Sequence, residues 1–335
     1  MDVFDLTRRL ISIPSTSGIE GEVVEFIAGQ LREIGFGVKV WDALPGRPNV
    51  YARVGNPDVV MSSHTDTVPP FFDVREDDEF IYGRGACDTK GLIAAMIVAS
   101  RELIKEGVND FGLLFVVGEE AGSKGAQDAN KVDNTCRYLI NGEPTESKLA
   151  LGSKGGVRLI LRAHGRAAHS AYPELGESAI HKLVGVLADL SATRLPTDPT
   201  LGSTTMNVGL INGGVAGNVI APEAEAELVF RVVSKSVDIK RLIEECIAGR
   251  VEIQYTFECD PVFMQRLDGF ETSVVSFTTD IPMLTNWGLP LLFGPGSILD
   301  AHTADEKISK AELARAPGSY AGIVRQLKER IRNGQ

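Results

Sequence analysis

The segment VVMSSHTDTVPP, residues 59–70, starts as an apolar strand and ends in polar side chains. Its first residues, Val59 to Met61, suit a strand that is covered on both faces. The apolar run stops at His64, and Asp66 follows two positions later. Because a core strand has little use for an imidazole or a carboxylate, this end of the strand indicates a chemical site.

Further short apolar runs occur along the chain. They are Leu113 to Val117, Tyr138 to Ile140 and Leu289 to Phe293. A long apolar helix is expected over Thr89 to Glu106. The segment STSGIEGEVVEFIAGQLREIGFG predicts an amphipathic helix with hydroxyl caps at Ser15 to Ser17 and a stop at Gly35. This alternation predicts an α/β domain with a mixed, mostly parallel sheet and helices on both of its faces.

The middle of the chain has a different pattern. Strands are expected over Val157 to Ala163, Thr204 to Ile211, Ala224 to Val232 and Glu252 to Phe257, and helices over Ala179 to Leu190 and Val237 to Ala248. This is the β-α-β-β-α-β order of a ferredoxin-like unit. We therefore predict an inserted α+β domain over residues 156–258, with residues 1–155 and 259–335 forming the sheet domain.

Length and composition agree with this division and exclude several classes of protein. A chain of 335 residues exceeds the size that one hydrophobic core usually fills. Its net charge of −11 argues against a nucleic-acid partner, since phosphate binding needs basic surface. No apolar run has the length of a membrane span, and the first residues do not resemble a signal peptide. We expect a cytoplasmic protein with no membrane partner and with four reduced cysteines.

Residues of the types that bind metals follow each of the predicted strands. His64 and Asp66 follow the first strand, Glu119 and Glu120 the second, Glu143 the third and His302 the fourth, while Asp88 precedes the long apolar helix. In open α/β sheets, ligands bind beyond the carboxyl ends of the strands. These side chains are therefore expected to meet at one edge of the sheet.

Two histidines with several carboxylates favour zinc, cobalt or manganese over magnesium or calcium. Three carboxylate ligands with two histidines are enough for two ions. The simplest arrangement gives each ion one histidine and one glutamate, with Asp88 bridging. Asp66 would then accept the second ring N–H of His64 and fix its tautomer. Of the adjacent Glu119 and Glu120, one would bind metal and the other would act as a general base.

Each of these residues also has an ordinary structural explanation. A lone His64 or His302 is more often a hydrogen-bonded structural histidine, and Asp66 or Glu143 could belong to a turn. Asp88 could be the N-cap of its helix. The hypothesis of a metal site therefore depends on their joint placement after the strands.

Several segments resemble the dinuclear zinc deacylases and exopeptidases, a family that includes acetylornithine deacetylase, succinyl-diaminopimelate desuccinylase, aminoacylase and glutamate carboxypeptidase. The matching segments occur in the order of the family and cover nearly the whole chain. They are IPSTSGIEGE, SSHTDTVPP, YGRGACDTKGLIAAM, GEEAGSKGA, INGEPTE, GRAAHSAYP, GNVIAPEAEAELVFRV and FGPGSILDAHTADE.

The resemblance implies a role for each residue of the expected site. One zinc ion would be held by His64, Asp88 and Glu143, and a second by Asp88, Glu120 and His302. It also implies that Asp66 orients His64, that Glu119 is the base, and that the Asp88–Thr89 peptide bond is cis. Thr89 stands where the family commonly has methionine, and the oxidisable Cys87 precedes the bridging aspartate.

For the inserted domain, the resemblance implies dimerisation. His169 matches a histidine that reaches the active site of the partner and polarises the scissile carbonyl, although it could also be a surface-loop residue. Asn218 and Arg231 match positions that contact substrate, and Arg231 could pair with a carboxylate. Without that role, Arg231 would be an exposed strand residue.

The function implied is hydrolysis of the amide bond of a small N-acyl amino acid by a homodimer. The segments GPGSILDAHTADE and HTDTVP look most like those of acetylornithine deacetylase and the related acetyl-lysine enzymes. A succinyl-diaminopimelate desuccinylase or a carboxypeptidase or dipeptidase is the alternative with the same centre. A catalytically silent relative that binds amino-acid derivatives is an alternative of another class.

Overall fold

The computed structural model describes residues 1–334 and divides the chain into two compact units. The first unit comprises Met1–Leu151, Phe263–Ser273 and the chain from Thr279 onward. The second comprises Gly152–Val262 and Val274–Thr278, and the predicted insert, residues 156–258, lies within it. Among the described residues, none of the helices combines the length and the apolar character that crossing a membrane requires.

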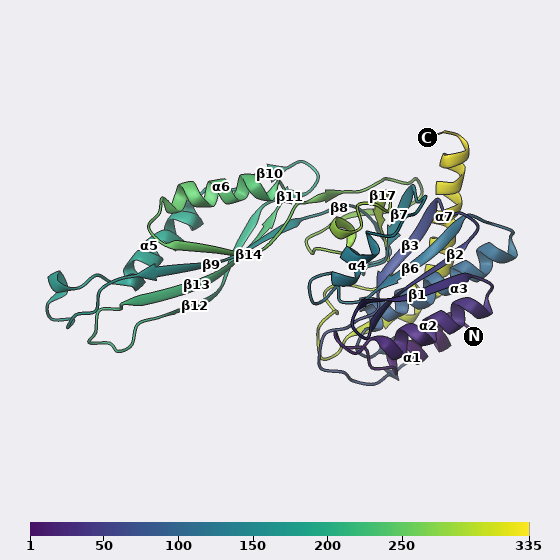
Figure 1. The fold of residues 1–335 in the computed structure, drawn as a ribbon, viewed down its shortest axis with the longest axis horizontal. Helices are drawn as coiled ribbons and strands as arrows, with labels where there is room; N and C mark the ends of the chain where they lie inside the picture. Colours follow the sequence, from purple (N-terminus) through teal and green to yellow (C-terminus); the bar gives the residue numbers. More distant parts are fainter. Residues whose placement is uncertain (335) are drawn as a thin grey trace. The chain divides into compact units, whose positions relative to one another are not determined.

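A six-stranded sheet forms the centre of the first unit, in the order β1-β2-β6-β3-β7-β17 (Figure 1). Its strands are β1 (Gly37–Leu44), β2 (Arg47–Val54), β6 (Phe111–Val116), β3 (Val59–His64), β7 (Tyr138–Asn141) and β17 (Leu289–Leu292). The four strands from β6 to β17 pair in parallel, whereas β1 and β2 pair antiparallel. The prediction of a mixed, mostly parallel sheet is therefore confirmed.

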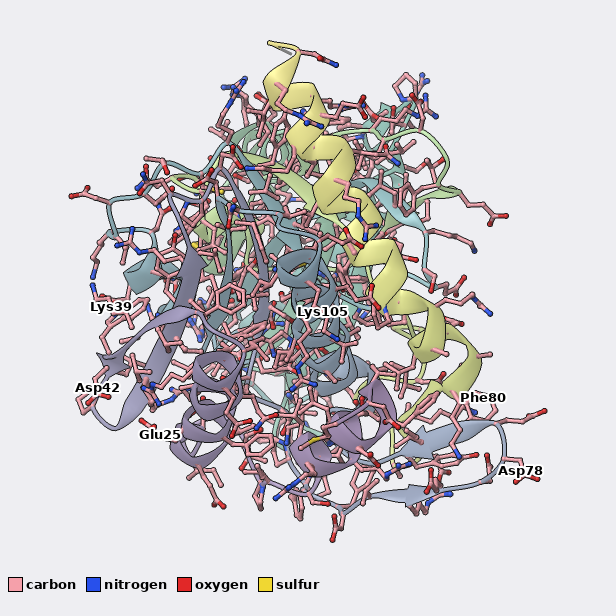
Figure 2. The ribbon with its side chains drawn as sticks, turned by 90° about the vertical axis from the view of Figure 1, so that its right-hand side faces the viewer. Glu25, Lys39, Asp42, Asp78, Phe80 and Lys105 are labelled. Carbon is pink, nitrogen blue, oxygen red and sulfur yellow. The ribbon has the colours of Figure 1, made fainter. Side chains whose placement is uncertain are left out.

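Both faces of this sheet are covered, and this explains why its strands are apolar throughout. One face packs against the helices α1 (Val3–Ile11), α2 (Gly21–Glu33), α3 (Gly91–Lys105) and α7 (Lys310–Arg332). Figure 2 shows this unit from the side of these helices, with the yellow α7 crossing the view. Val59 and Met61 point into that core, while Val60 points to the opposite face, where it packs with α4 (Lys124–Ala129) and Trp287.

The second unit is a four-stranded antiparallel sheet, in the order β12-β13-β9-β14, covered on one face by two helices. In chain order its elements are β9 (Gly155–His164), α5 (Ala179–Ala192), β12 (Thr205–Gly213), β13 (Glu223–Val232), α6 (Ser236–Ile247) and β14 (Glu252–Cys259). Residues of β13 are buried at every second position, as expected for a sheet with one covered face. The predicted ferredoxin-like order is confirmed.

Short elements complete the two units. They are the hairpin β10 (Thr197–Asp198) and β11 (Gly202–Ser203), the sheet β15 (Val262–Phe263), β8 (Leu149–Ser153) and β16 (Thr272–Val275), the sheet β18 (Lys307–Ser309), β5 (Phe80–Tyr82) and β4 (Arg75–Glu76), and the helical turns η1 (Ala86–Lys90), η2 (Pro173–Leu175) and η3 (Ile281–Met283).

The predicted start of α2 was wrong. The helix begins at Gly21, and its N-cap residue is Glu20, whose side chain makes no capping hydrogen bond. Ser15 to Ser17 therefore do not cap the helix. The hydroxyl group of Ser17 instead donates a hydrogen bond to Asp66, which belongs to the segment after β3.

Candidate metal centre

The residues expected to bind metal come together at the carboxyl edge of the first unit's sheet. His64 is the last residue of β3, and Glu120 and Glu143 follow the neighbouring strands β6 and β7. His302 follows β17, the next strand in the sheet order. Parallel strands that are neighbours in a sheet bring the residues after their carboxyl ends to one place, although these residues are far apart in sequence.

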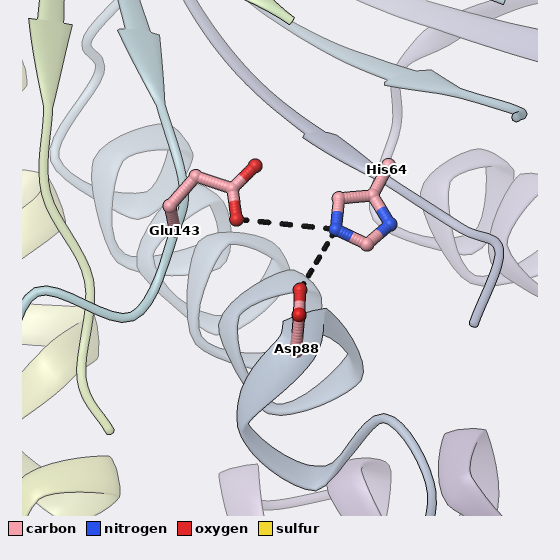
Figure 3. Close-up of side chains that lie close together, drawn as sticks. All are labelled: His64, Asp88 and Glu143. Atoms are coloured by element: carbon pink, nitrogen blue, oxygen red, sulfur yellow. Dashed lines mark hydrogen bonds and ion pairs between the residues drawn. The ribbon is translucent and has the colours of Figure 1, made fainter. Parts of the chain in front are cut away.

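One group of ligand-type side chains consists of His64, Asp88 and Glu143, whose ligand atoms all lie within 4.8 Å of one another. The Nε2 atom of His64 lies 2.9 Å from Oδ1 of Asp88 and 3.9 Å from Oε2 of Glu143 (Figure 3). All three residues are buried, and the Oε1 atom of Glu143 has no hydrogen-bond partner among the described residues. A buried carboxylate oxygen without a partner is costly, so Glu143 Oε1 is in a position to accept a cation.

A second group consists of Asp88, Glu120 and His302. The Nε2 atom of His302 lies 2.8 Å from Oε1 of Glu120 and 3.3 Å from Oδ2 of Asp88. Asp88 thus directs Oδ1 at the first group and Oδ2 at the second, which is the geometry of a bridging carboxylate. The alternative that Asp88 caps the following helix does not hold, because the N-cap residue of α3 is Lys90.

These residues fit a pair of divalent cations. Each group offers one imidazole nitrogen and two carboxylates, a donor set that suits zinc and similar transition metals. The electrostatics agree with this assignment. Hydrogen bonds to Asp88 and Glu120 raise the pKa of His302 to about 10. Burial by itself lowers the pKa of His64, but hydrogen bonds to Asp66 and Asp88 outweigh it and raise the pKa overall. Both shifts show that the carboxylates attract positive charge to this place.

Asp66 is placed to orient His64. The Nδ1 atom of His64 lies 2.9 Å from the main-chain oxygen of Asp66 and 3.5 Å from its Oδ1 atom. Assigned from these contacts, the Nδ1–H donates to Asp66, so that Nε2 is left to face Asp88 and Glu143. Asp66 Oδ1 also accepts a hydrogen bond from the main-chain N–H of Glu119 at 3.0 Å.

The segment around Asp88 accommodates both departures from the family pattern. Thr89 is buried, and its hydroxyl group donates to the main-chain oxygen of His64 at 2.8 Å and accepts from Ser63 at 2.7 Å. A polar residue is therefore accommodated here with partners of its own. Burial raises the pKa of the Cys87 thiol, which keeps it in the less reactive protonated form. The Asp88–Thr89 peptide bond is cis, as the resemblance implied.

Sequence reasoning missed Asp280, which lies beside this centre. Its carboxylate is buried near Ser123, but neither oxygen makes a hydrogen bond of good geometry with a described residue. Burial raises the pKa of Asp280 to about 6. Its charge also raises the pKa of Glu119 and of Glu143, for which burial is the largest cause. Asp280 follows β16, a strand of the small sheet β15-β8-β16 and not of the six-stranded sheet, so the pattern that identified the other residues could not find it.

The three residues expected in the inserted domain all belong to the second unit. His169 and Asn218 lie in neighbouring loops, where the N–H of Ser170 donates to the main-chain oxygen of Asn218 at 3.0 Å. The Nδ1 atom of His169 accepts a hydrogen bond from the N–H of Ala171 at 3.1 Å. Arg231 lies on β13, and burial together with the nearby Arg158 lowers its pKa. Their contacts with substrate remain predictions.

Comparison with known proteins gives matches over nearly the whole chain. The model of the peptidase dimerisation domain family matches residues 151–250. A peptidase M20 domain-containing protein of Schizosaccharomyces pombe is 38% identical over 336 residues, which cover 96% of this chain and 84% of that protein. A probable carboxypeptidase of Aspergillus clavatus is 36% identical over 365 residues, covering 96% of this chain and 88% of the relative.

Solved structures share the fold. The aminopeptidase PepT of Bacillus cereus superposes with a TM-score of 0.79 at 19% identity, over 96% of each chain. A dinuclear metal-binding peptidase of the M20 family from Bacillus subtilis superposes with a TM-score of 0.68 at 15% identity, over 95% of each chain.

Proposed function

Since the chain belongs to the M20 family of metallopeptidases, which are hydrolases, we propose that it cleaves an amide bond of a small N-acyl amino acid or peptide with two metal ions. The observation that carries this proposal is the pair of ligand groups that share Asp88. A structural carboxylate has no need to direct its two oxygens at two separate imidazoles. A site for two metal ions, in contrast, would use a carboxylate that faces both of them.

We assign one zinc ion to His64, Asp88 and Glu143 and the other to Asp88, Glu120 and His302. Cobalt or manganese could replace zinc, because the same nitrogen and oxygen donors suit them. When bound, the ions would polarise the scissile carbonyl and lower the pKa of the attacking water. Side chains of the protein would carry out the proton transfers and bind the substrate.

Glu119 is the proposed general base. Among the described residues its side chain forms no ion pair, whereas Glu120 contacts His302 at 2.8 Å. Its carboxylate would take a proton from water and later deliver it to the leaving amine. Burial raises the pKa of Glu119, and cations bound by the neighbouring ligand groups would lower it again, toward the range in which a carboxylate can take up and return a proton. Asp66 would keep His64 oriented and the main chain of Glu119 in place.

The second unit would supply the groups that recognise the substrate. We assign His169 to the stabilisation of the oxyanion, acting across a homodimer, and Asn218 and Arg231 to substrate binding. Arg231 makes no ion pair with a described residue, so its guanidinium is available for a carboxylate of the substrate. The match of residues 151–250 to a peptidase dimerisation domain supports the homodimer.

Two classes of substrate are compatible with this proposal. The resemblance of the sequence segments favours acetylornithine or acetyl-lysine as substrate. The similarity to a probable carboxypeptidase, at 36% identity over 96% of the chain, favours a carboxypeptidase or dipeptidase. Both classes use the same metal centre and differ only in the pocket that receives the acyl group or the amino-terminal residue.

The test measures product release by the zinc-loaded protein. The substrates are acetylornithine, acetyl-lysine, succinyl-diaminopimelate, and dipeptides with free and with amidated carboxyl termini. Fastest release from the acetyl compounds supports the deacetylase. Fastest release from succinyl-diaminopimelate supports the desuccinylase, and fastest release from dipeptides with a free carboxylate supports the carboxypeptidase or dipeptidase. If no substrate is cleaved by protein that holds two metal ions, the proposal fails and a silent binding protein becomes the better explanation.

A further inference from the structure

The loop of residues 15–20, which precedes α2, lies beside the segment that follows β3. Its Thr16 forms a parallel bridge with Thr67. The N–H of Thr67 donates to the main-chain oxygen of Ser15 at 3.0 Å, and the N–H of Ser17 donates to that of Thr67 at 3.1 Å. These bonds hold the loop next to Asp66, within the first unit.

A chain of hydrogen bonds leads from this loop to Glu119. The hydroxyl group of Ser17 donates to Oδ2 of Asp66 at 2.6 Å, and Oδ1 of Asp66 accepts the N–H of Glu119 at 3.0 Å. Ser17 therefore occupies one oxygen of Asp66 while the main chain of Glu119 occupies the other. Because the acceptor is a buried carboxylate, these hydrogen bonds are of the strong, charge-assisted kind.

A second link connects the same loop with Gly118, the residue before Glu119. Glu20 is buried, forms a two-pronged ion pair with Arg47, and accepts the N–H of Gly18 at 3.1 Å. The Arg47 guanidinium lies so close to Gly118 that an added Cβ atom would be 2.9 Å from its Nη2 atom. Gly118 has a φ of +77°, a backbone conformation that favours glycine. The loop thus supports the Glu119 segment from two directions.

We propose that Ser17 is a positioning residue that acts on Glu119 through Asp66, an inference that rests on the proposed role of Glu119 as base. Without the Ser17 hydroxyl, the Asp66 carboxylate would lose its Oδ2 partner, and the contacts of Oδ1 with Glu119 and His64 would be left to hold it. The N–H of Glu119 would then have a less firmly fixed acceptor, and the Glu119 carboxylate would take several positions instead of one. Catalysis would suffer more than substrate binding, because Ser17 belongs to neither ligand group and reaches the centre through Asp66.

The experiment compares three variants of the full-length zinc-loaded protein. Ser17→Ala removes the donor and Ser17→Thr retains it. The matched control is Ser15→Ala, since Ser15 lies in the same loop and its buried hydroxyl has no hydrogen-bond partner among the described residues. If Ser17→Ala does not fold, Ser17→Cys replaces it with a weaker donor of similar size.

For Ser17→Ala we expect kcat to fall at least about tenfold, as is usual for residues that support a metal site, with little change in KM or metal content. Ser17→Thr should recover most of the loss, and Ser15→Ala should match the wild type. Hydrogen exchange of the main chain over residues 117–122 is a second readout, which does not depend on activity. The exchange rate should rise in Ser17→Ala, with or without zinc. It should stay unchanged in Ser15→Ala.

The two readouts separate this inference from the proposed function. Unchanged kcat and unchanged exchange in Ser17→Ala would overturn the inference while leaving the proposed function intact. Equal losses in Ser17→Ala and Ser17→Thr would also overturn it, since the hydroxyl would not be the cause. A wild type that cleaves no substrate would contradict the proposed function and with it the catalytic role of Ser17.

Discussion

Glu119 and Glu120 are adjacent in sequence, yet their side chains have different surroundings. Oε1 of Glu120 lies 2.8 Å from the imidazole of His302. Glu119 is held among the described residues by its main chain, whose N–H donates to Asp66 and whose oxygen accepts from Gly122. Burial raises the pKa of Glu119, and the charges of Asp280 and Glu120 raise it further against the opposing charge of His64. The structure therefore distinguishes the carboxylate of Glu120, which contacts a histidine, from that of Glu119, which does not. The sequence pattern by itself had left open which of the two binds metal and which is the base.

This difference predicts the effect of Glu119→Gln. The amide cannot accept and return a proton, so kcat should fall by about 10²–10⁴-fold, the usual contribution of a general base. Zinc content, measured by elemental analysis, should stay at the wild-type level because the ligand groups are intact. The control is Glu25→Gln, a change at an exposed position on α2 (Figure 2). Turnover at the wild-type rate would show that Glu119 is not the base.

Residues that follow strands could be predicted from the sequence, whereas residues that support them could not. The strand pattern placed His64, Glu120, Glu143 and His302 together because parallel strands share a carboxyl edge. Ser17 and Asp280 reach the same place through loops, whose course depends on packing between distant segments. No periodicity in the sequence reports such packing.

At the scale of elements, the adjacency of β6, β3, β7 and β17 is what assembles the centre. Their apolar runs were recognisable because both faces of these strands are buried. The antiparallel strands β1 and β2 were not predicted. Much of β1 is only partly buried and β2 carries arginines at Arg47 and Arg53, so neither has a continuous apolar run.

Glu20 at the start of α2 and Arg47 at the start of β2 form a largely buried ion pair. We predict that breaking this pair lowers the free energy of unfolding more than breaking an exposed ion pair does. Glu20→Gln would leave the Arg47 guanidinium in a largely buried position without its charged partner, and the free energy of unfolding should fall by about 3 kcal/mol. Asp305→Asn breaks the exposed pair with Arg75 and should leave stability unchanged within error, since solvent screens such pairs. Urea unfolding monitored by circular dichroism measures both variants, and equal effects would contradict the argument.

The ligand groups predict that metal removal destabilises the first unit. Without cations, the carboxylates of Asp88, Glu120 and Glu143 repel one another and Glu143 Oε1 has no partner. Metal at 100 times its Kd would contribute about 2.7 kcal/mol. Chelation should therefore lower the unfolding temperature by about 5–10 °C for a unit of this size.

The location of this effect can be tested by hydrogen exchange. Exchange should rise at the ends of β3, β6 and β7 after chelation and stay constant in β9, β13 and α5, which belong to the second unit. Zinc should restore protection and magnesium should not, because the groups contain histidine. A uniform rise over both units would contradict a metal site confined to the first.

At the scale of the whole molecule, the second unit has a hydrophobic core of its own, formed by one face of its sheet and by α5 and α6. Its edge strand β12 is exposed over most of its length and carries Leu210 and Ile211, with 55% and 54% of their surfaces exposed. An unprotected edge strand with apolar side chains offers main-chain groups and surface to a second chain. This feature supports the proposed homodimer independently of any match to known proteins.

Substitution of this edge should separate the two protomers. In Leu210→Glu combined with Ile211→Lys, burial of two charged groups would oppose association, so light scattering after gel filtration should give one protomer of 36.1 kDa instead of twice that mass. The control is Val237→Glu, which changes an equally exposed apolar residue on α6. Since His169 is proposed to act across the dimer, the monomer should also lose turnover although it keeps its zinc. A dimer that survives the double substitution would assign the interface to another surface, and a fully active monomer would exclude His169 of a partner from the reaction.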